Sequence, residues 1–109
     1  MKLSSVITAV KAEPLTHRSE ADLAGCYTSD LLSDVLAHAS PGMLWITIQS
    51  HRNVVSCALA KDIGAVLFTC GRKPDPAVVA EAEAGGIVLL STRQTTYEAA
   101  GKLWKAGLR

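Results

Sequence analysis

Apolar and polar residues alternate along this chain in blocks that predict strands and helices in turn. The region from residue 43 onward is the most regular. Apolar runs begin at residues 43, 65 and 87, and a segment of helical character follows each of them, so one strand–helix unit recurs every 22 residues. Strands that alternate with helices are typical of an α/β domain with a parallel sheet.

The unit in the second half of the chain is the most complete. An apolar strand over residues 65–69 leads into the polar loop 69–73, and Asp75-Pro76 opens a helix over residues 76–84. Asp75 favours a helix N-cap, and Pro76 suits the first helical position, where its missing N–H would be unpaired anyway. A second apolar run over residues 87–90 completes a parallel βαβ unit.

The remaining elements follow from the same reasoning. Leu3, Val6, Ile7 and Val10 repeat at helical spacing, and Thr95 with Glu98 forms a capping box for the final helix. The other predicted elements are a helix over 3–11, a small edge strand over 13–16, a polar turn over 17–20, strands over 24–28 and 43–48, a helix capped by Ser29-Asp30, a helix capped by Asn53 that ends at Gly64, and a final helix that ends at Gly107.

Each of the later helices is expected to bury one apolar face. For the helix after Ser29-Asp30, the predicted inward residues are Leu31, Leu32, Val35, Leu36 and Ala39. For the helix that Asn53 caps they are Val54, Val55, Ala58 and Leu59, and for the final helix they are Tyr97, Ala100, Gly101, Leu103 and Trp104. Trp45 and Trp104 are interpreted as core or interface anchors.

Length and composition narrow the class of protein. With 109 residues the chain is one domain, residues 1–109. With a net charge of +1, the chain lacks the excess of positive charge that is typical of proteins that bind nucleic acid or an anionic membrane. No apolar run reaches the ~20 residues that a membrane-spanning helix needs. The three cysteines are odd in number and widely spaced, which argues against a disulfide framework and indicates a protein of the reducing cytoplasm. The His and Cys residues also lack the spacing that is typical of metal ligands. We therefore expect neither a metal nor a cofactor.

Polar residues gather where the predicted parallel strands end. The carboxyl ends of parallel strands lie side by side along one edge of the sheet, the edge formed by the strand ends, and open α/β sheets bind ligands there. The candidate ligand-binding residues are Ser29, Asp30, Gln49, His51, Thr69, Cys70, Gly71 and Arg72, with Ser91-Thr92 at the same edge. We expect hydrogen-bond donors from the loop at Thr69 and Gly71 and from the Ser29 hydroxyl. The alternative is that these residues are only helix caps and turn formers.

The residues at this edge contain no motif that identifies a particular ligand or reaction. Arg72 and Lys73 beside Gly71 resemble a phosphate cradle in composition, but no Walker or dinucleotide-binding motif is present, and both can equally be solvated charges. His51 and Asp30 are a conceivable acid–base pair. Because no nucleophile with an orienting partner is recognisable, we interpret Asp30 as a helix cap, His51 as a loop residue and Cys70 as a small loop residue.

Residues 26–106, from the SDLLSDVLAHASPG segment through the TTYEAAGKLW helix, resemble the DRTGG domain. That family is similar to the N-terminal domain of HPr kinase/phosphorylase and occurs beside CBS modules in some pyrophosphatases. Its characteristic positions match Asp30-Leu31 and Thr69-Cys70-Gly71 here. Leu31 stands where Arg is usual, Ser29-Asp30 replaces a Gly-Asp start, and Cys70 stands where the first of two glycines is usual.

The resemblance implies a three-layer α/β/α domain with a mixed, mainly parallel sheet, without kinase activity and often dimeric. We therefore expect a regulatory, sensing or interaction module rather than an enzyme, one that binds a small anionic or nucleotide-like ligand or a partner enzyme. Two alternatives stay open. One is a small phosphotransfer or hydrolase enzyme that uses Asp30, His51 and Thr69. The other is a purely structural dimer that scaffolds a complex. Apart from these alternatives, we expect a homodimer whose interface draws on a helix face such as Leu31, Val35 and Leu36 or on the final helix with Trp104.

Overall fold

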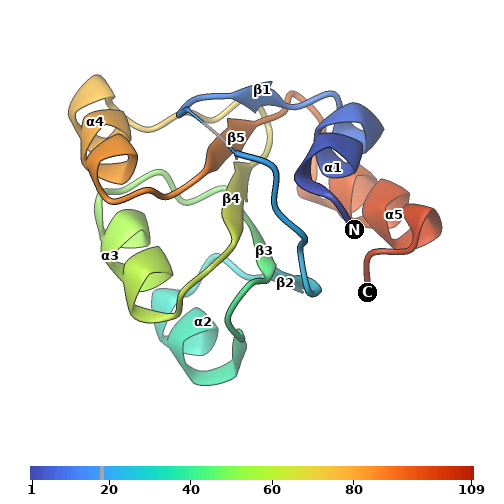
Figure 1. Cartoon of the computed structure of the whole chain (residues 1–109), viewed down its shortest axis with the longest axis horizontal. Coiled ribbons are helices and arrows are strands. Elements are labelled where there is room, and N and C mark those ends of the chain that lie inside the picture. The colour runs from blue at the N-terminus through green and yellow to red at the C-terminus, as the bar shows by residue number, and fades with distance from the viewer. Residues whose placement is uncertain (18) are drawn as a thin grey trace.

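The computed structural model describes residues 1–17 and 19–109 and contains one mixed sheet of five strands (Figure 1). In chain order the elements are α1 (Leu3–Val10), β1 (Glu13–Pro14), β2 (Cys26–Thr28), α2 (Leu32–His38), β3 (Leu44–Thr47), α3 (Asn53–Ala60), β4 (Ala65–Phe68), α4 (Pro76–Ala84), β5 (Leu89–Ser91) and α5 (Thr96–Ala106). Arg18, in the predicted polar turn, lies outside the described residues. Every predicted helix and strand is present, with strand ends shifted by one or two residues.

The strand order is β1-β5-β4-β3-β2, and β2 to β5 run parallel while β1 pairs antiparallel with β5. Each parallel strand pairs with the next one along the chain, so the three crossovers step across the sheet in the same direction. Because such crossovers are right-handed, their helices lie on one face. Figure 1 shows α2, α3 and α4 on that face and α1 with α5 on the other. The predicted three-layer α/β/α fold with a mainly parallel sheet is confirmed.

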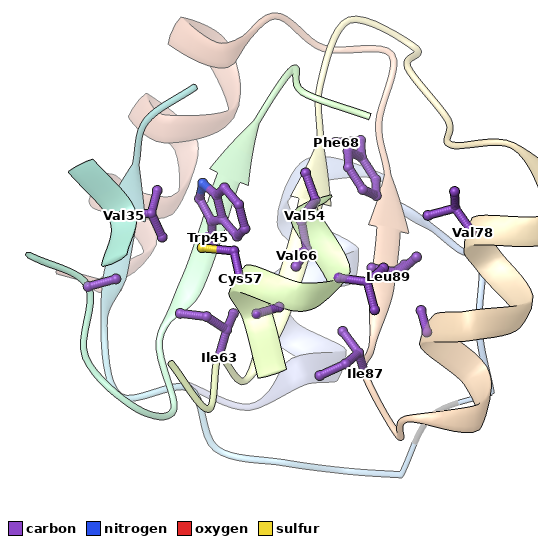
Figure 2. Close-up of a cluster of buried hydrophobic side chains, with 14 residues drawn as sticks. Val35, Trp45, Val54, Cys57, Ile63, Val66, Phe68, Val78, Ile87 and Leu89 are labelled. Atoms are coloured by element: carbon purple, nitrogen blue, oxygen red, sulfur yellow. The ribbon is translucent and has the colours of Figure 1, made fainter. Parts of the chain in front are cut away.

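Two apolar cores lie on the two faces of the sheet. Trp45, Val66 and Phe68 face the layer of α2 to α4, as Figure 2 shows, whereas Leu44 and Ile46 pack against α1 and α5. Successive residues of a strand point to opposite faces, so β3 and β4 are buried throughout. Trp45 is fully buried, and its indole N–H donates to the Ser29 carbonyl oxygen at 2.8 Å. Its role as a core anchor is confirmed.

The ends of α5 agree with prediction. The Thr95 hydroxyl accepts a hydrogen bond from the Glu98 N–H at 3.1 Å, and the Glu98 carboxylate accepts one from the Thr95 N–H at 3.1 Å. Gly107 ends the helix in the left-handed conformation with φ of 105°. Pro76 is the first residue of α4, as expected, although the Asp75 side chain makes no capping hydrogen bond there.

Three predicted helix caps are wrong. Asp30 does not cap α2: the Ser29 hydroxyl accepts from the Leu31 N–H at 3.2 Å, and the Asp30 carboxylate turns toward β3. Asn53 is the first residue of α3, and its N–H donates to the His51 ring at 3.2 Å. Helix α3 ends at Ala60 and not at Gly64, and Asp62 after it takes a left-handed conformation with φ of 53°.

Five residues expected to face inward are exposed. The exposed fractions are 64% for Leu31, 45% for Leu36, 51% for Leu59, 90% for Tyr97 and 61% for Trp104. Gly101 is also exposed, while the side of α5 that packs on the sheet and α1 carries Ala99 and Leu103. Helix α5 has two apolar stripes, and the one with the smaller side chains, Ala99 and Leu103, packs into the core beside α1.

Gly64 and Gly101 give a matched test of the packing. A Cβ atom at Gly64 would lie 2.7 Å from Leu23 Cδ2 and 2.8 Å from the Gly42 carbonyl oxygen, whereas one at Gly101 would meet nothing within 4 Å. We expect Gly64→Ala to lower the free energy of unfolding by about 1–3 kcal/mol. Gly101→Ala should raise it by about 1 kcal/mol through helix propensity alone. Urea denaturation of both variants measures this, and equal effects of the two substitutions would contradict the described packing.

Candidate functional site

The predicted site residues follow four neighbouring strands at one edge of the sheet. Ser29 and Asp30 follow β2, Gln49 and His51 follow β3, and the loop from Thr69 to Arg72 follows β4. Ser91 and Thr92 lie at the end of β5. The edge therefore assembles as parallel pairing requires, but its side chains do not converge on a single point.

Asp30 and His51 have separate partners. One Asp30 carboxylate oxygen accepts from the Thr47 hydroxyl and from the Ile48 N–H, both at 2.9 Å. The Gln49 N–H donates to the same Thr47 hydroxyl at 3.0 Å. The His51 ring accepts from the Asn53 N–H instead. Asp30 thus joins the β2–α2 loop to the end of β3, and no acid–base hydrogen bond links it to His51 among the described residues.

The loop after β4 makes a tight turn through two left-handed residues. Cys70 has φ of 57° and Gly71 has φ of 70°, and the Arg72 N–H donates to the Thr69 carbonyl oxygen at 3.0 Å. Two consecutive positive φ angles are the geometry that favours a Gly-Gly pair. Cys70, where the resemblance leads one to expect glycine, therefore keeps a left-handed backbone at a cost of about 1–2 kcal/mol.

The donors expected from this loop are already used within the protein. The N–H groups of Thr69, Cys70 and Gly71 donate to the carbonyl oxygens of Thr47, Gln94 and Thr92 respectively, at 3.2, 2.8 and 2.8 Å. The Thr69 side chain is fully buried, and its hydroxyl lies 2.7 Å from the Thr96 hydroxyl. These three N–H groups are therefore paired with β3 and the β5–α5 loop, which leaves the expectation of ligand donors at Thr69 and Gly71 without support from the geometry.

The Ser29 hydroxyl is also engaged. Besides accepting from Leu31, it joins the Tyr27 hydroxyl in holding the pKa of the Asp34 carboxyl below its usual range. The Tyr27 hydroxyl donates to Asp34 at 2.8 Å, and the His38 ring lies 3.0 Å from the other Asp34 oxygen. The polar side chains in and after β2 are therefore hydrogen-bonded to one another.

A pocket of about 430 Å³ opens at the other end of the edge, over the end of β5. Its charged side chains are Lys11, Lys73, Arg93 and Glu13, which gives three cations against one carboxylate. The Lys73 ammonium lies 2.7 Å from the Glu13 carboxylate. The lining is completed by Gly71, Ser91 and Thr92. An excess of cations around a concave polar surface favours an anionic ligand.

The floor of this pocket is held by side-chain hydrogen bonds. The Ser91 hydroxyl donates to the Arg72 carbonyl oxygen at 2.8 Å, and the Thr92 hydroxyl donates to the Val10 carbonyl oxygen at 2.7 Å. Both side chains are buried. These bonds tie the end of β5 to the β4–α4 loop and to the last turn of α1.

The topology explains why sequence reasoning missed much of this pocket. Lys11 and Glu13 reach it because β1 runs antiparallel to β5, so the beginning of β1 lies at the edge where the parallel strands end. Lys11, with φ of 51°, makes the chain reversal between α1 and β1. Arg93 directly follows Ser91-Thr92, which the sequence did place at this edge, and that adjacency was the available signal.

His51 lies at a second, smaller pocket of about 220 Å³ between the β3–α3 loop and the start of α4. Its walls include Ser50, Asp75 and the ion pair of Arg52 with Glu81. The predicted site residues are thus divided, with Gly71 at the cation-lined pocket and His51 at the smaller one.

The cysteines differ in accessibility. Burial raises the pKa of the Cys26 thiol to about 11 and also raises the pKa of Cys57, whereas Cys70 is exposed. In residues 1–17 and 19–109, no three His, Cys, Asp or Glu side chains are grouped to hold a metal ion. Every helix in that part of the chain is too short or too polar to cross a membrane.

Comparison with known proteins identifies the class to which this α/β/α domain belongs. The family model of the DRTGG domain matches residues 5–106. The chain therefore belongs to the DRTGG domain family, and the resemblance read from its sequence is confirmed.

A solved structure has the same fold. It contains the CBS and DRTGG domains of the regulatory region of Clostridium perfringens pyrophosphatase, in complex with its activator diadenosine tetraphosphate. The TM-score is 0.78 at 13% sequence identity, and the match covers 93% of this chain and 45% of that one. The chain thus spans less than half of that structure. No curated protein sequence matches it.

The turn after β4 allows a direct test of its backbone geometry. Gly71→Ala should lower the free energy of unfolding by about 1–2 kcal/mol, because a Cβ atom is disfavoured at positive φ. Cys70→Ala is the matched control: it keeps a Cβ atom in the same conformation, and the side chain is exposed. We expect little change for the control. Chemical denaturation that shows both variants as stable as the parent would contradict the left-handed turn.

Proposed function

We propose that this domain is a non-catalytic regulatory module that binds a small anionic ligand, of the nucleotide or phosphorylated-metabolite class, in the cation-lined pocket at the end of β5. The observation that carries the proposal is the convergence of Lys11, Lys73 and Arg93 around one pocket. Phosphate groups are recognised by such clusters through charge-assisted hydrogen bonds.

The comparisons support the regulatory part of the proposal. The pyrophosphatase domains occupy a regulatory region and were crystallised with a nucleotide activator that carries several phosphates. At 13% identity this likeness establishes the shared fold, so the ligand class proposed here depends on the charges of the pocket. We further propose that the chain acts on a partner enzyme in the cytoplasm, where its three free thiols would stay reduced.

The enzyme alternative has less support. It would need Asp30, His51 and Thr69 to act together, yet each of these side chains has a different local partner and Thr69 is fully buried. A purely structural dimer would leave the cation-lined pocket unused. We also propose that the chain forms a homodimer. Val35 cannot contribute to its interface, because this side chain is fully buried.

Removal of a pocket cation should weaken binding. Thermal-shift assays and calorimetry with pyrophosphate, ADP and diadenosine tetraphosphate would identify the best probe, with adenosine as the uncharged control. Because a hydrogen bond to a charged group contributes about 1.5–3 kcal/mol, Lys73→Ala and Arg93→Ala should each reduce affinity by roughly tenfold or more.

Lys61→Ala is the matched control for these variants. It removes one positive charge just after α3, at the opposite edge of the sheet. Equal losses in all three variants would indicate a nonspecific charge effect. Binding of adenosine as tightly as ADP would contradict an anion-binding pocket.

Removal of the pocket carboxylate should act in the opposite direction. Glu13 competes with an anionic ligand for the Lys73 ammonium, 2.7 Å away, and repels it directly. We expect Glu13→Gln to tighten binding of the same probe by several-fold, and the gain should shrink as salt screens the charges. Calorimetry at two ionic strengths measures this. Weaker binding in Glu13→Gln would show that the ligand does not approach Lys73.

A further inference from the structure

The outward side of α5 exposes two large aromatic side chains. Tyr97 is 90% exposed and Trp104 is 61% exposed. Residues at spacings of four and three share one side of a helix, so Tyr97, Gly101 and Trp104 form one stripe. The opposite side, with Ala99 and Leu103, faces the core. Figure 1 shows α5 at the outer margin of the molecule, beyond the sheet.

Gly101 lies in the middle of this stripe. A shallow groove of about 540 Å³ runs along the helix over Gly101, between the side chains of Tyr97 and Trp104. Because a Cβ atom at Gly101 would meet nothing within 4 Å, the fold of the single chain does not require glycine there. Glycine in an exposed helix disfavours the helix, but it allows another helix to approach closely.

The charges along α5 indicate what covers the groove. Glu98 lies in the first turn, and the bonds from Thr95 hold the pKa of its carboxyl below its usual range. Lys102 and Lys105 lie in the second half, and the Arg109 guanidinium carbon is 4.9 Å from the centre of the Trp104 ring. Two such helices side by side and antiparallel would place the acidic turn of each against the basic end of the other.

We propose that two copies of this chain pair through α5, antiparallel around a two-fold axis that passes near Gly101. The Trp104 ring of each copy packs beside the Tyr97 end of its partner's helix, and the two glycines form the point of closest approach. Aromatic residues are enriched in such interfaces. This proposal rests on the homodimer proposed above, whereas anion binding by the pocket does not depend on it.

A second exposed apolar groove lies between α2 and α3, where Leu36 is 45% exposed. Its other walls include Asn53 and Ser56 and carry no charges that would orient a second copy. It therefore serves as the control surface.

Light scattering and tryptophan fluorescence of the whole chain over the micromolar range test the proposal. We expect the mass to rise with concentration toward twice 11.5 kDa, with a blue shift of the emission. Trp45 is already buried, so the shift reports on Trp104. A helix pair of this size is a small interface, and reversible dissociation is expected.

Gly101→Gln places a helix-favouring but bulky side chain in the groove and should weaken the dimer by roughly tenfold or more. The matched control Leu36→Gln should leave the dimer intact. Gly101→Ala should weaken the dimer while the melting temperature of the dilute chain rises, which excludes misfolding as the cause.

Two results would overturn the proposal. If the parent chain keeps a mass of 11.5 kDa at every concentration, the homodimer itself fails, whatever calorimetry shows for the pocket. If Leu36→Gln dissociates the dimer and Gly101→Gln does not, a homodimer exists but its interface is not on α5.

Discussion

Parallel pairing of four strands that follow one another in the chain constrains the rest of the structure. Since every crossover from β2 to β5 steps in the same direction, α2, α3 and α4 must share one face. The apolar residues on the other face, among them Leu44, Ile46 and Leu67, are covered only because the two ends of the chain fold back as α1 and α5. The return of the N-terminal segment then adds β1 antiparallel to β5 and brings Lys11 to the edge where the parallel strands end.

Side chains hold that edge in place. Asp30 joins the β2–α2 loop to β3, Ser91 joins β5 to the β4–α4 loop, and Thr92 joins β5 to α1. The backbone N–H groups of the β4–α4 turn are also satisfied internally. A ligand at this edge therefore meets a rigid floor, and recognition in our proposal comes from the cationic side chains around it. Such a floor costs little conformational entropy when a ligand binds.

Much of the fold could be predicted from the sequence, because strand runs, the Thr95–Glu98 capping box and Pro76 are local signals. The choice of helix face could not, since α5 carries two apolar stripes and only its packing beside α1 selects Ala99 and Leu103 over Tyr97 and Trp104. The position of the candidate site at one edge of the sheet could be predicted, but the pocket at that edge could not. The positions of Lys11 and Glu13 depend on antiparallel pairing of a two-residue strand, and the use of the Gly71 N–H depends on Thr92, 21 residues further along the chain.

The central claim is that an anion binds over the end of β5, and amide chemical-shift mapping of the isotope-labelled chain tests it most directly. Titration with ADP should move the resonances of Gly71, Ser91, Thr92 and Arg93, which line or border the pocket. Resonances of Gly42, Gly64 and Gly86, at the opposite edge of the sheet, should stay in place. Shifts that cluster at those three glycines, or no shift at residues 91–93 with any phosphorylated probe, would contradict the account.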